Sequence, residues 1–177
     1  MHSRMLAFFV ATLALIGCAS HTSNPLLPSS SSSSSLQATP SSSRSETSDI
    51  PTDAQLKKIL SPLAYSVLRQ GATEVPFTSD LLHENRTGTY VTADCNEPVF
   101  RSEQKFDSGT GWPSFWAPIT ADAVILEEDT TLGITRTEVR SKKCNSHLGH
   151  VFDDGPLPTG KRYCINGVAL KFVADAE

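Results

Sequence analysis

One cysteine near the C-terminus stands in a polar setting that suits a reactive thiol. Cys164 lies two residues after Arg162 and two residues before Asn166. Because side chains alternate between the two faces of a β-strand, all three would share one face if this segment is a strand. A nearby guanidinium can favour the thiolate, which is the nucleophilic form of cysteine. From this string alone, an inert buried cysteine remains as good an interpretation as a reactive one.

Two histidines in one short string bear on whether Cys164 is reactive or inert. His147 and His150 stand three positions apart, and such a pair can bind a metal, transfer protons or simply lie on the surface. Metal binding by this pair alone would need a third ligand, which the string does not offer. Proton transfer beside a cysteine nucleophile is a common catalytic arrangement, so the histidines favour a reactive Cys164.

Aromatic residues gather in a segment that otherwise has the composition of a loop. The segment Gly111–Trp116 holds Trp112, Phe115 and Trp116 together with a glycine and a proline. These rings could belong to the hydrophobic core, or they could wall an apolar substrate pocket.

The elements that must position these residues are mostly short strands. Two short helices are predicted first, over residues 52–60 and 61–71, from an N-terminal capping box and from a Ser-Pro start with a glycine stop. From Gly88 onward, runs rich in Thr, Val, Phe and Tyr alternate with turn residues, which indicates antiparallel strands. The predicted strands are 89–93, 98–102, 123–128, 133–141, 147–152 and 162–172.

Composition excludes several classes of protein. The chain has 177 residues, of which 38% are hydrophobic and 19% charged, and a formal net charge of -4. One modest domain fits this length, and the acidic balance argues against nucleic acid as a partner. Polar and apolar segments alternate, so a multi-span membrane protein and a fully disordered chain are both excluded.

The N-terminal region has the features of an export signal followed by a tether. Residues 1–18 combine Arg4 with an apolar run over 6–16 and end in a Leu-Ile-Gly-Cys sequence that resembles a bacterial lipobox. We therefore expect Cys18 to be lipidated, although a plain secretory signal with a chance cysteine is the alternative. Residues 19–50 are rich in serine and proline and form a flexible tether, and residues 51–177 form the domain. The expected location is the bacterial cell envelope, facing the periplasm, with the outer membrane favoured by Ala19.

Four strings of the domain together resemble the B-type methionine sulfoxide reductases, which are peptide-methionine (R)-S-oxide reductases. They occur in the order found in that family, and the resemblance runs from about residue 60 to residue 172. The resemblance implies a mainly β (α+β) fold with two antiparallel β-sheets and short N-terminal helices. The four strings are Phe106–Phe115, Arg136–Arg140, His147–Pro156 and Arg162–Asn166.

The resemblance also implies a reaction and a nucleophile. The family reduces the R epimer of methionine sulfoxide to methionine, usually within a protein. Carried over to this sequence, the Cys164 thiolate attacks the sulfoxide sulfur and is left as a sulfenic acid. His147 or His150 would supply the proton that the sulfoxide oxygen gains.

Five further residues receive roles from the same resemblance. Asn166 would form hydrogen bonds within the catalytic network, and Arg162 would lower the thiol pKa or orient the site. Trp112 would pack against the ε-methyl group of the substrate and so select the epimer. Phe115 and Phe152 are weaker candidates for the pocket wall.

One departure from the family concerns a structural zinc ion. Many members bind zinc through two Cys-x-x-Cys pairs, but the matching positions here are Thr92, Cys95, Ser141 and Cys144. Two thiols with a threonine and a serine make a poor tetrahedral zinc site, so we expect no zinc and no other cofactor. If the fold is kept, Cys95 and Cys144 face each other across the former metal site. The resemblance therefore implies a disulfide between them, which an oxidising envelope would favour.

A second departure concerns the recycling of the enzyme. Thr110 stands where a large part of the family has a resolving cysteine. The sulfenic acid on Cys164 would then be reduced by a small thiol, by a thioredoxin-like protein, or by Cys95 or Cys144 after a loop movement. We favour direct reduction by an external thiol.

Two other functions remain as alternatives. The same fold could serve as a non-catalytic binding module in the envelope, or Cys164 and His150 could act as a cysteine hydrolase. The intact set of catalytic residue types favours the reductase. Its expected partners are oxidised methionine-containing proteins, a thiol reductant and the membrane that holds the lipid anchor, and we expect a monomer.

Overall fold

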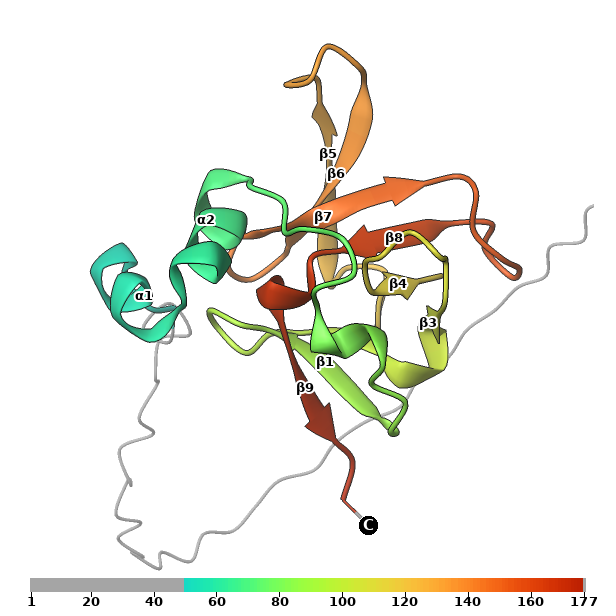
Figure 1. Cartoon of the computed structure of the whole chain (residues 1–177), viewed down its shortest axis with the longest axis horizontal. Coiled ribbons are helices and arrows are strands. Elements are labelled where there is room, and N and C mark those ends of the chain that lie inside the picture. Colours follow the sequence, from blue (N-terminus) through green and yellow to red (C-terminus); the bar gives the residue numbers. More distant parts are fainter. Residues whose placement is uncertain (1–49, 177) are drawn as a thin grey trace, which may run out of the picture. The chain divides into compact units, whose positions relative to one another are not determined.

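The fold is mainly β, with two antiparallel sheets and two short helices (Figure 1). A computed structural model of the chain describes residues 50–176. The expected signal peptide, Cys18 and the tether up to residue 49 lie outside the described residues. Within 50–176 the predicted fold class is confirmed, and neither helix has the length and hydropathy needed to cross a membrane.

Both helices begin and end where the sequence provides caps. Helix α1 (Asp53–Ile59) starts with a capping box, in which the Thr52 backbone N–H donates to Gln55 Oε1 at 2.8 Å. Helix α2 (Pro62–Gln70) starts at Ser61, whose hydroxyl accepts from the backbone N–H of Ala64 at 3.1 Å. It ends at Gly71, which has a left-handed φ of 68°. These predicted helices are therefore confirmed.

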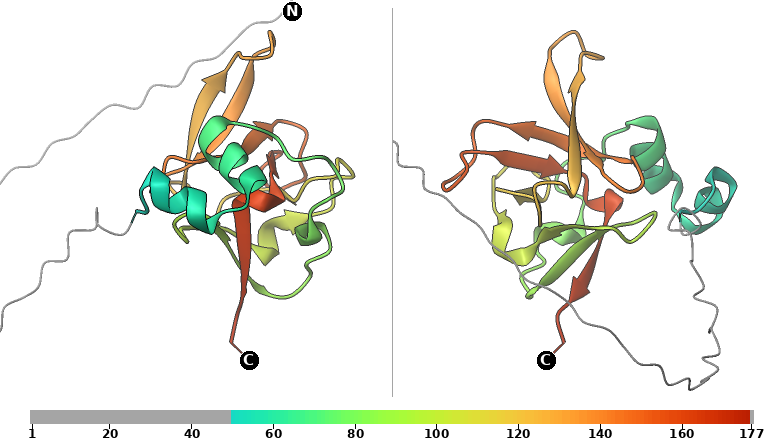
Figure 2. Two further views of the ribbon diagram at one scale, coloured as in Figure 1. Left: turned by 60° about the vertical axis from the view of Figure 1, so that its left-hand side comes forward. Right: turned by 180° about the vertical axis from the view of Figure 1, so that it is seen from behind.

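The larger sheet has six strands and carries most of the residues with chemical interest. Its strand order is β3-β4-β8-β7-β6-β5, and every neighbouring pair is antiparallel. The β5–β6 hairpin projects beyond the rest of the domain in all views (Figures 1 and 2). In this order the strands are β3 (Lys105–Phe106), β4 (Ser114–Phe115), β8 (Arg162–Ile165), β7 (His147–Phe152), β6 (Arg136–Ser141) and β5 (Val124–Asp129).

The smaller sheet has three antiparallel strands in the order β2-β1-β9. They are β2 (Pro98–Arg101), β1 (Gly88–Thr92) and β9 (Leu170–Ala174). Between residues 50 and 176, three short 3₁₀ helices connect the elements, namely η2 (Asp80–Leu82), η3 (Ser102–Gln104) and η4 (Gly167–Ala169).

The prediction of one strand over residues 162–172 is wrong. The chain leaves the large sheet after Ile165, turns through η4 and enters the small sheet as β9. Asn166 therefore caps η4 and does not continue the face of β8. The predicted start at residue 133 is wrong as well, because β6 starts at Arg136 after a turn at Gly133. The short strands β3 and β4 were not predicted.

The core lies between the two sheets and is closed on one side by α2. Val67 and Leu68 from α2 are buried with Tyr90 and Phe100 from the small sheet, and the Phe100 ring stacks on Phe115 with centroids 4.4 Å apart. Phe115 is fully buried. The expectation that Phe115 walls a substrate pocket is therefore wrong, since its side chain points into the core.

Candidate active site

Cys164 opens onto a small cavity of about 120 Å³ on the large sheet. The cavity brings together five of the eight residues expected at the site, namely Trp112, His150, Phe152, Cys164 and Asn166. It leaves out His147, Arg162 and Phe115. The remaining lining residues are Thr73, Arg136 and Gly149.

The register of the sheet explains why these side chains meet. Cys164 on β8 is directly opposite Ser114 on β4 and His150 on β7. Directly opposite residues of antiparallel strands share a face, so the three side chains form one row. The next row, with Phe115 opposite Tyr163, points to the other face and is buried in the core. Because side chains alternate along β8, Cys164 lies on the face that lines the cavity and Tyr163 on the face that is buried in the core.

Gly149 lets the two strands approach each other beside the thiol. A Cβ at this position would lie 2.1 Å from the backbone oxygen of Cys164. Any side chain there would push β7 away from β8, so the spacing between His150 and Cys164 depends on glycine at position 149.

A chain of hydroxyl groups reaches the sulfur. The Thr110 hydroxyl lies 3.7 Å from Cys164 Sγ, and Ser108 links Thr110 to Ser114 through hydrogen bonds of 2.8 and 2.7 Å. Burial nevertheless raises the pKa of the Cys164 thiol, and Thr110 and Arg162 offset this rise only in part. The expected activation of the thiolate by Arg162 is therefore weaker than the effect of burial.

Arg162 is tied to an acidic residue instead of facing the cavity. Its Nε and Nη2 atoms donate to the two carboxylate oxygens of Asp154 at 2.9 and 2.8 Å. Its guanidinium also lies over the Phe152 ring, 4.5 Å from the centroid. Arg162 thus holds the Phe152 wall in place while it contributes positive charge near the sulfur.

The two histidines have different surroundings. His147 is almost completely buried, its Nδ1 pairs with Glu138 Oε1 at 2.6 Å, and its Nε2 has no partner among the described residues. Burial lowers the pKa of His147, and Glu138 opposes that shift. The two imidazole rings are 5.5 Å apart, and His150 alone lines the cavity. His147 therefore lies behind His150 as seen from the cavity.

Asp129 at the end of β5 holds His150 in place. Its carboxylate accepts from His150 Nε2 at 2.7 Å and from Arg136 Nη2 at 2.6 Å. Hydrogen bonds from Thr131, His150 and Arg136 hold the pKa of Asp129 well below its usual range. An ionised Asp129 favours the tautomer of His150 that carries its proton on Nε2.

Asn166 braces the cavity wall. Its Oδ1 accepts from the backbone N–H of Glu74 at 2.9 Å, and its Nδ2 donates to the backbone oxygen of Leu148 at 3.0 Å. Both ends of the carboxamide are thus paired with backbone groups. These hydrogen bonds of Asn166 join backbone groups of Glu74 and Leu148, whereas the expected catalytic network would join it to His147, His150 or Cys164.

Sequence reasoning missed Glu74, which is buried in the segment between α2 and β1. Its carboxylate accepts from the backbone N–H groups of Gly167 and Val168 at the start of η4, and its backbone oxygen accepts from Trp112 Nε1 at 3.2 Å. Glu74 therefore positions both Asn166 and Trp112. Asp129 and Glu138 were missed as well, because each pairs with its histidine on another strand of the sheet.

The residues that match the zinc ligands of the family do not suit a metal in this protein. Cys95 and Cys144 are joined by a disulfide with Cα atoms 6.5 Å apart, so their sulfurs are not free thiolates. Thr92 is a hydrogen-bonding neighbour of Cys95, with 3.3 Å between hydroxyl and sulfur, and the Ser141 hydroxyl accepts from the backbone N–H of Ser146. The buried Asp94 carboxylate is close to both sulfurs. One carboxylate beside a disulfide is far from the four thiol or imidazole ligands of structural zinc.

Comparisons with known proteins agree with the geometry. Residues 60–174 match the SelR domain. The chain is 51% identical over 125 residues to the peptide methionine sulfoxide reductase MsrB of Methanosarcina barkeri, covering 71% of this chain and 88% of the relative. It is 54% identical over 126 residues to the protein of the same name from Leifsonia xyli subsp. xyli, covering 71% and 91%. The chain therefore belongs to the SelR family of B-type methionine sulfoxide reductases.

Proposed function

We propose that this protein reduces the R epimer of methionine sulfoxide in polypeptides, with Cys164 as the nucleophile. The observation that carries the proposal is the position of Cys164 at a small cavity walled by Trp112 and Phe152, with His150 directly across the strand pair. Cys164 is also the one free cysteine among residues 50–176.

The first step transfers oxygen from substrate to enzyme. The Cys164 thiolate donates an electron pair to the sulfoxide sulfur, the S–O bond breaks, and the oxygen ends on Cys164 as a sulfenic acid. The substrate sulfur is reduced to the thioether of methionine, and the cysteine is oxidised by the same two electrons. The oxygen must gain a proton as its bond to sulfur weakens. His150 lines the cavity beside Cys164 and, as the imidazolium with its Nε2–H held by Asp129, would supply this proton from Nδ1.

The cavity walls suit the substrate side chain. The methyl and methylene groups of methionine sulfoxide are apolar and match the faces of Trp112 and Phe152, while the sulfoxide oxygen needs a polar partner on one side. Because His150 lies opposite Cys164 on the strand pair, a rigid pocket of this kind presents only one epimer with its oxygen toward the proton donor. That geometry selects a single epimer, and membership of the B-type family makes it the R epimer.

Regeneration of Cys164 needs an external reductant. One thiol molecule displaces water from the sulfenic acid to form a mixed disulfide, and a second releases the free Cys164 thiol. Thr110 occupies the position next to the sulfur, 3.7 Å away, and it cannot act as a resolving thiol. Cys95 and Cys144 are bonded to each other, which supports a small thiol or a thioredoxin-like protein as the reductant.

We place this activity in the bacterial cell envelope. The support comes from residues 1–50, with the lipobox at Cys18 and the serine-rich tether. A lipid anchor with a tether would let a monomeric domain reach oxidised envelope proteins. The test is membrane fractionation of cells that express the wild-type chain and the Cys18→Ala variant. The wild type should be in the membrane fraction and the variant should not, and equal distribution of both would contradict the anchor.

A single-turnover experiment tests the chemistry. Reduced enzyme mixed with excess peptide methionine-R-sulfoxide, without any reductant, should form about one methionine per enzyme and one dimedone adduct at Cys164, which marks a sulfenic acid. The Cys164→Ser variant is the control and should form neither. Formation of a new intramolecular disulfide at Cys164, instead of the adduct, would refute the proposal that the reductant is external.

A further inference from the structure

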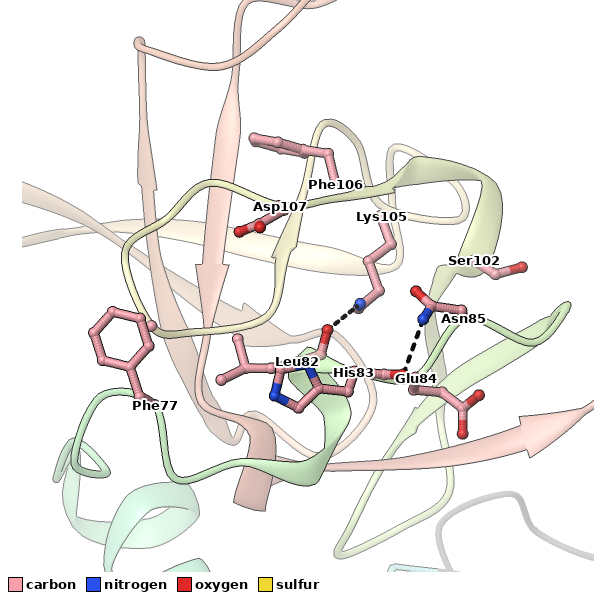
Figure 3. Close-up of a pocket in the computed structure, with 10 residues that line it drawn as sticks. Phe77, Leu82, His83, Glu84, Asn85, Ser102, Lys105, Phe106 and Asp107 are labelled. Atoms are coloured by element: carbon pink, nitrogen blue, oxygen red, sulfur yellow. Dashed lines mark hydrogen bonds between the residues drawn. The ribbon is translucent and has the colours of Figure 1, made fainter.

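A second and larger cavity of about 490 Å³ lies beside the candidate active site. It is bounded by two segments, residues 77–85 and residues 102–107, which face each other across it (Figure 3). We propose that this cavity, called here the flank pocket, binds the polypeptide stretch next to the oxidised methionine and seats an apolar side chain. This inference rests on the proposed function, and it extends that function to the sequence around the substrate residue.

The flank pocket lies next to the Cys164 cavity, because residues adjacent in the sequence line the two. Gly111 lines the flank pocket, and the next residue, Trp112, lines the Cys164 cavity. The Phe77 backbone N–H donates to the backbone oxygen of Gly111 at 2.8 Å. Since a methionine sulfoxide held in the Cys164 cavity belongs to a chain that continues in both directions, one of those directions can enter the flank pocket.

The close packing at Gly111 fixes the boundary between the two cavities. Gly111 has a φ of 90°, and a Cβ there would lie 2.8 Å from both Pro76 Cβ and Phe77 Cδ2. Only glycine allows this contact. The segment around Phe77 is therefore held against the loop that positions Trp112.

Phe77 adds an exposed aromatic ring to a pocket whose lining is otherwise mostly polar or charged. Its side chain is 70% exposed, and its φ of 65° lies in the left-handed region that bulky residues avoid. An exposed aromatic ring in an unfavourable backbone conformation is costly, and such features are concentrated at ligand sites. Leu82 and Phe106, both partly buried, add apolar surface to the same pocket.

Charge in the pocket favours an uncharged occupant. The Glu84 carboxylate is bound by Arg86 through two hydrogen bonds, and Lys105 Nζ donates to the backbone oxygen of Leu82 at 2.9 Å (Figure 3). Lys105 and Asp107 line the pocket with opposite charges. Neither sign of charge is therefore left in excess, which fits an uncharged stretch of polypeptide better than an acidic or basic one.

The test compares substrates that differ only in the flanking residues. The substrates are a capped single methionine-R-sulfoxide, a heptapeptide with leucine on both sides of the sulfoxide, and the same peptide with serine instead. The test variant is Phe77→Asn, because asparagine tolerates the left-handed conformation and removes only the ring. The matched control is Leu132→Asn in the β5–β6 turn, where the side chain is also 70% exposed.

The expected result is a loss confined to the leucine peptide. Removal of one aromatic anchor at a peptide site lowers kcat/KM by about tenfold, so Phe77→Asn should lose about tenfold on the leucine peptide through KM. Its activity on the capped residue should stay within about twofold, and Leu132→Asn should match the wild type on all three. Equal losses on the capped residue and the leucine peptide, or no loss on either, would overturn the inference.

A binding measurement separates this inference from the proposed function. Fluorescein-labelled leucine peptide is titrated into Cys164→Ser and into Cys164→Ser with Phe77→Asn, and the expected weakening is again about tenfold. If Phe77→Asn weakens peptide binding but the wild type shows no turnover, the proposed reductase function is overturned and the proposal of the flank pocket is kept. Wild-type turnover with equal binding by the two variants would overturn the flank pocket alone.

Discussion

The disulfide between Cys95 and Cys144 should contribute a large part of the stability of the domain. The two cysteines are 49 residues apart in sequence, so the bond closes a loop that contains β2, β3, β4, β5 and β6. A cross-link lowers the conformational entropy of the unfolded chain, and the chain-entropy relation for a loop of this length gives about 4 kcal/mol at 25 °C. Removal of the bond should lower the free energy of unfolding by roughly this amount.

The assay is urea unfolding of the wild type and of the Cys95→Ala/Cys144→Ala double variant, followed by tryptophan fluorescence. With a urea dependence of about 2 kcal/mol per molar for a small domain, the midpoint should fall by about 2 M. Dithiothreitol should lower the wild-type midpoint and leave that of the variant unchanged. An unchanged wild-type midpoint after complete reduction, or alkylation of Cys95 and Cys144 without prior reduction, would refute the reasoning.

Three further predictions concern the site. Asp129→Asn removes the ionised partner of His150 and should lower kcat/KM by at least about tenfold. The pH profile of kcat/KM should also shift, which a merely structural change would not produce. An unshifted pH profile would contradict the positioning role of Asp129. Thr110→Val removes a hydroxyl that lowers the pKa of Cys164, so thiolate absorbance at 240 nm should appear at higher pH than in the wild type. Because burial raises the pKa of Cys164, less of it is thiolate at neutral pH than in an exposed cysteine. The single-turnover rate of the wild type should therefore keep rising between pH 7 and pH 9, and a plateau below pH 8 would contradict this expectation.

Much of the fold could be predicted because its signals are local. The capping box at Thr52 and the glycine stop at Gly71 lie within the helices that they delimit. Strand alternation likewise put Arg162 and Cys164 on one face of β8, with Tyr163 and Ile165 buried on the other, although Asn166 lies beyond the end of this strand. The prediction of one strand over residues 162–172 was wrong because the end of β8 depends on where the chain leaves one sheet for the other. An extended segment has the same sequence pattern in either sheet.

The site could be predicted only in part, for a related reason. Cys164 and His150 were found from their own strings, because their residue types carry the chemistry. Glu74 and Asp129 act on residues 92 and 21 positions away along the chain, and no short string reports such a pairing. Phe115 was misplaced because an aromatic residue next to a turn is equally consistent with a core and with a pocket wall.

The most direct measurement of the central claim is turnover of dabsyl-methionine-R-sulfoxide and of its S epimer, with dithiothreitol, by the wild type and by Cys164→Ser. The account predicts reduction of the R epimer alone, and complete loss of that activity in the variant. Equal reduction of both epimers, persistence of activity in Cys164→Ser, or no turnover by folded wild-type protein with a titratable Cys164 would contradict it.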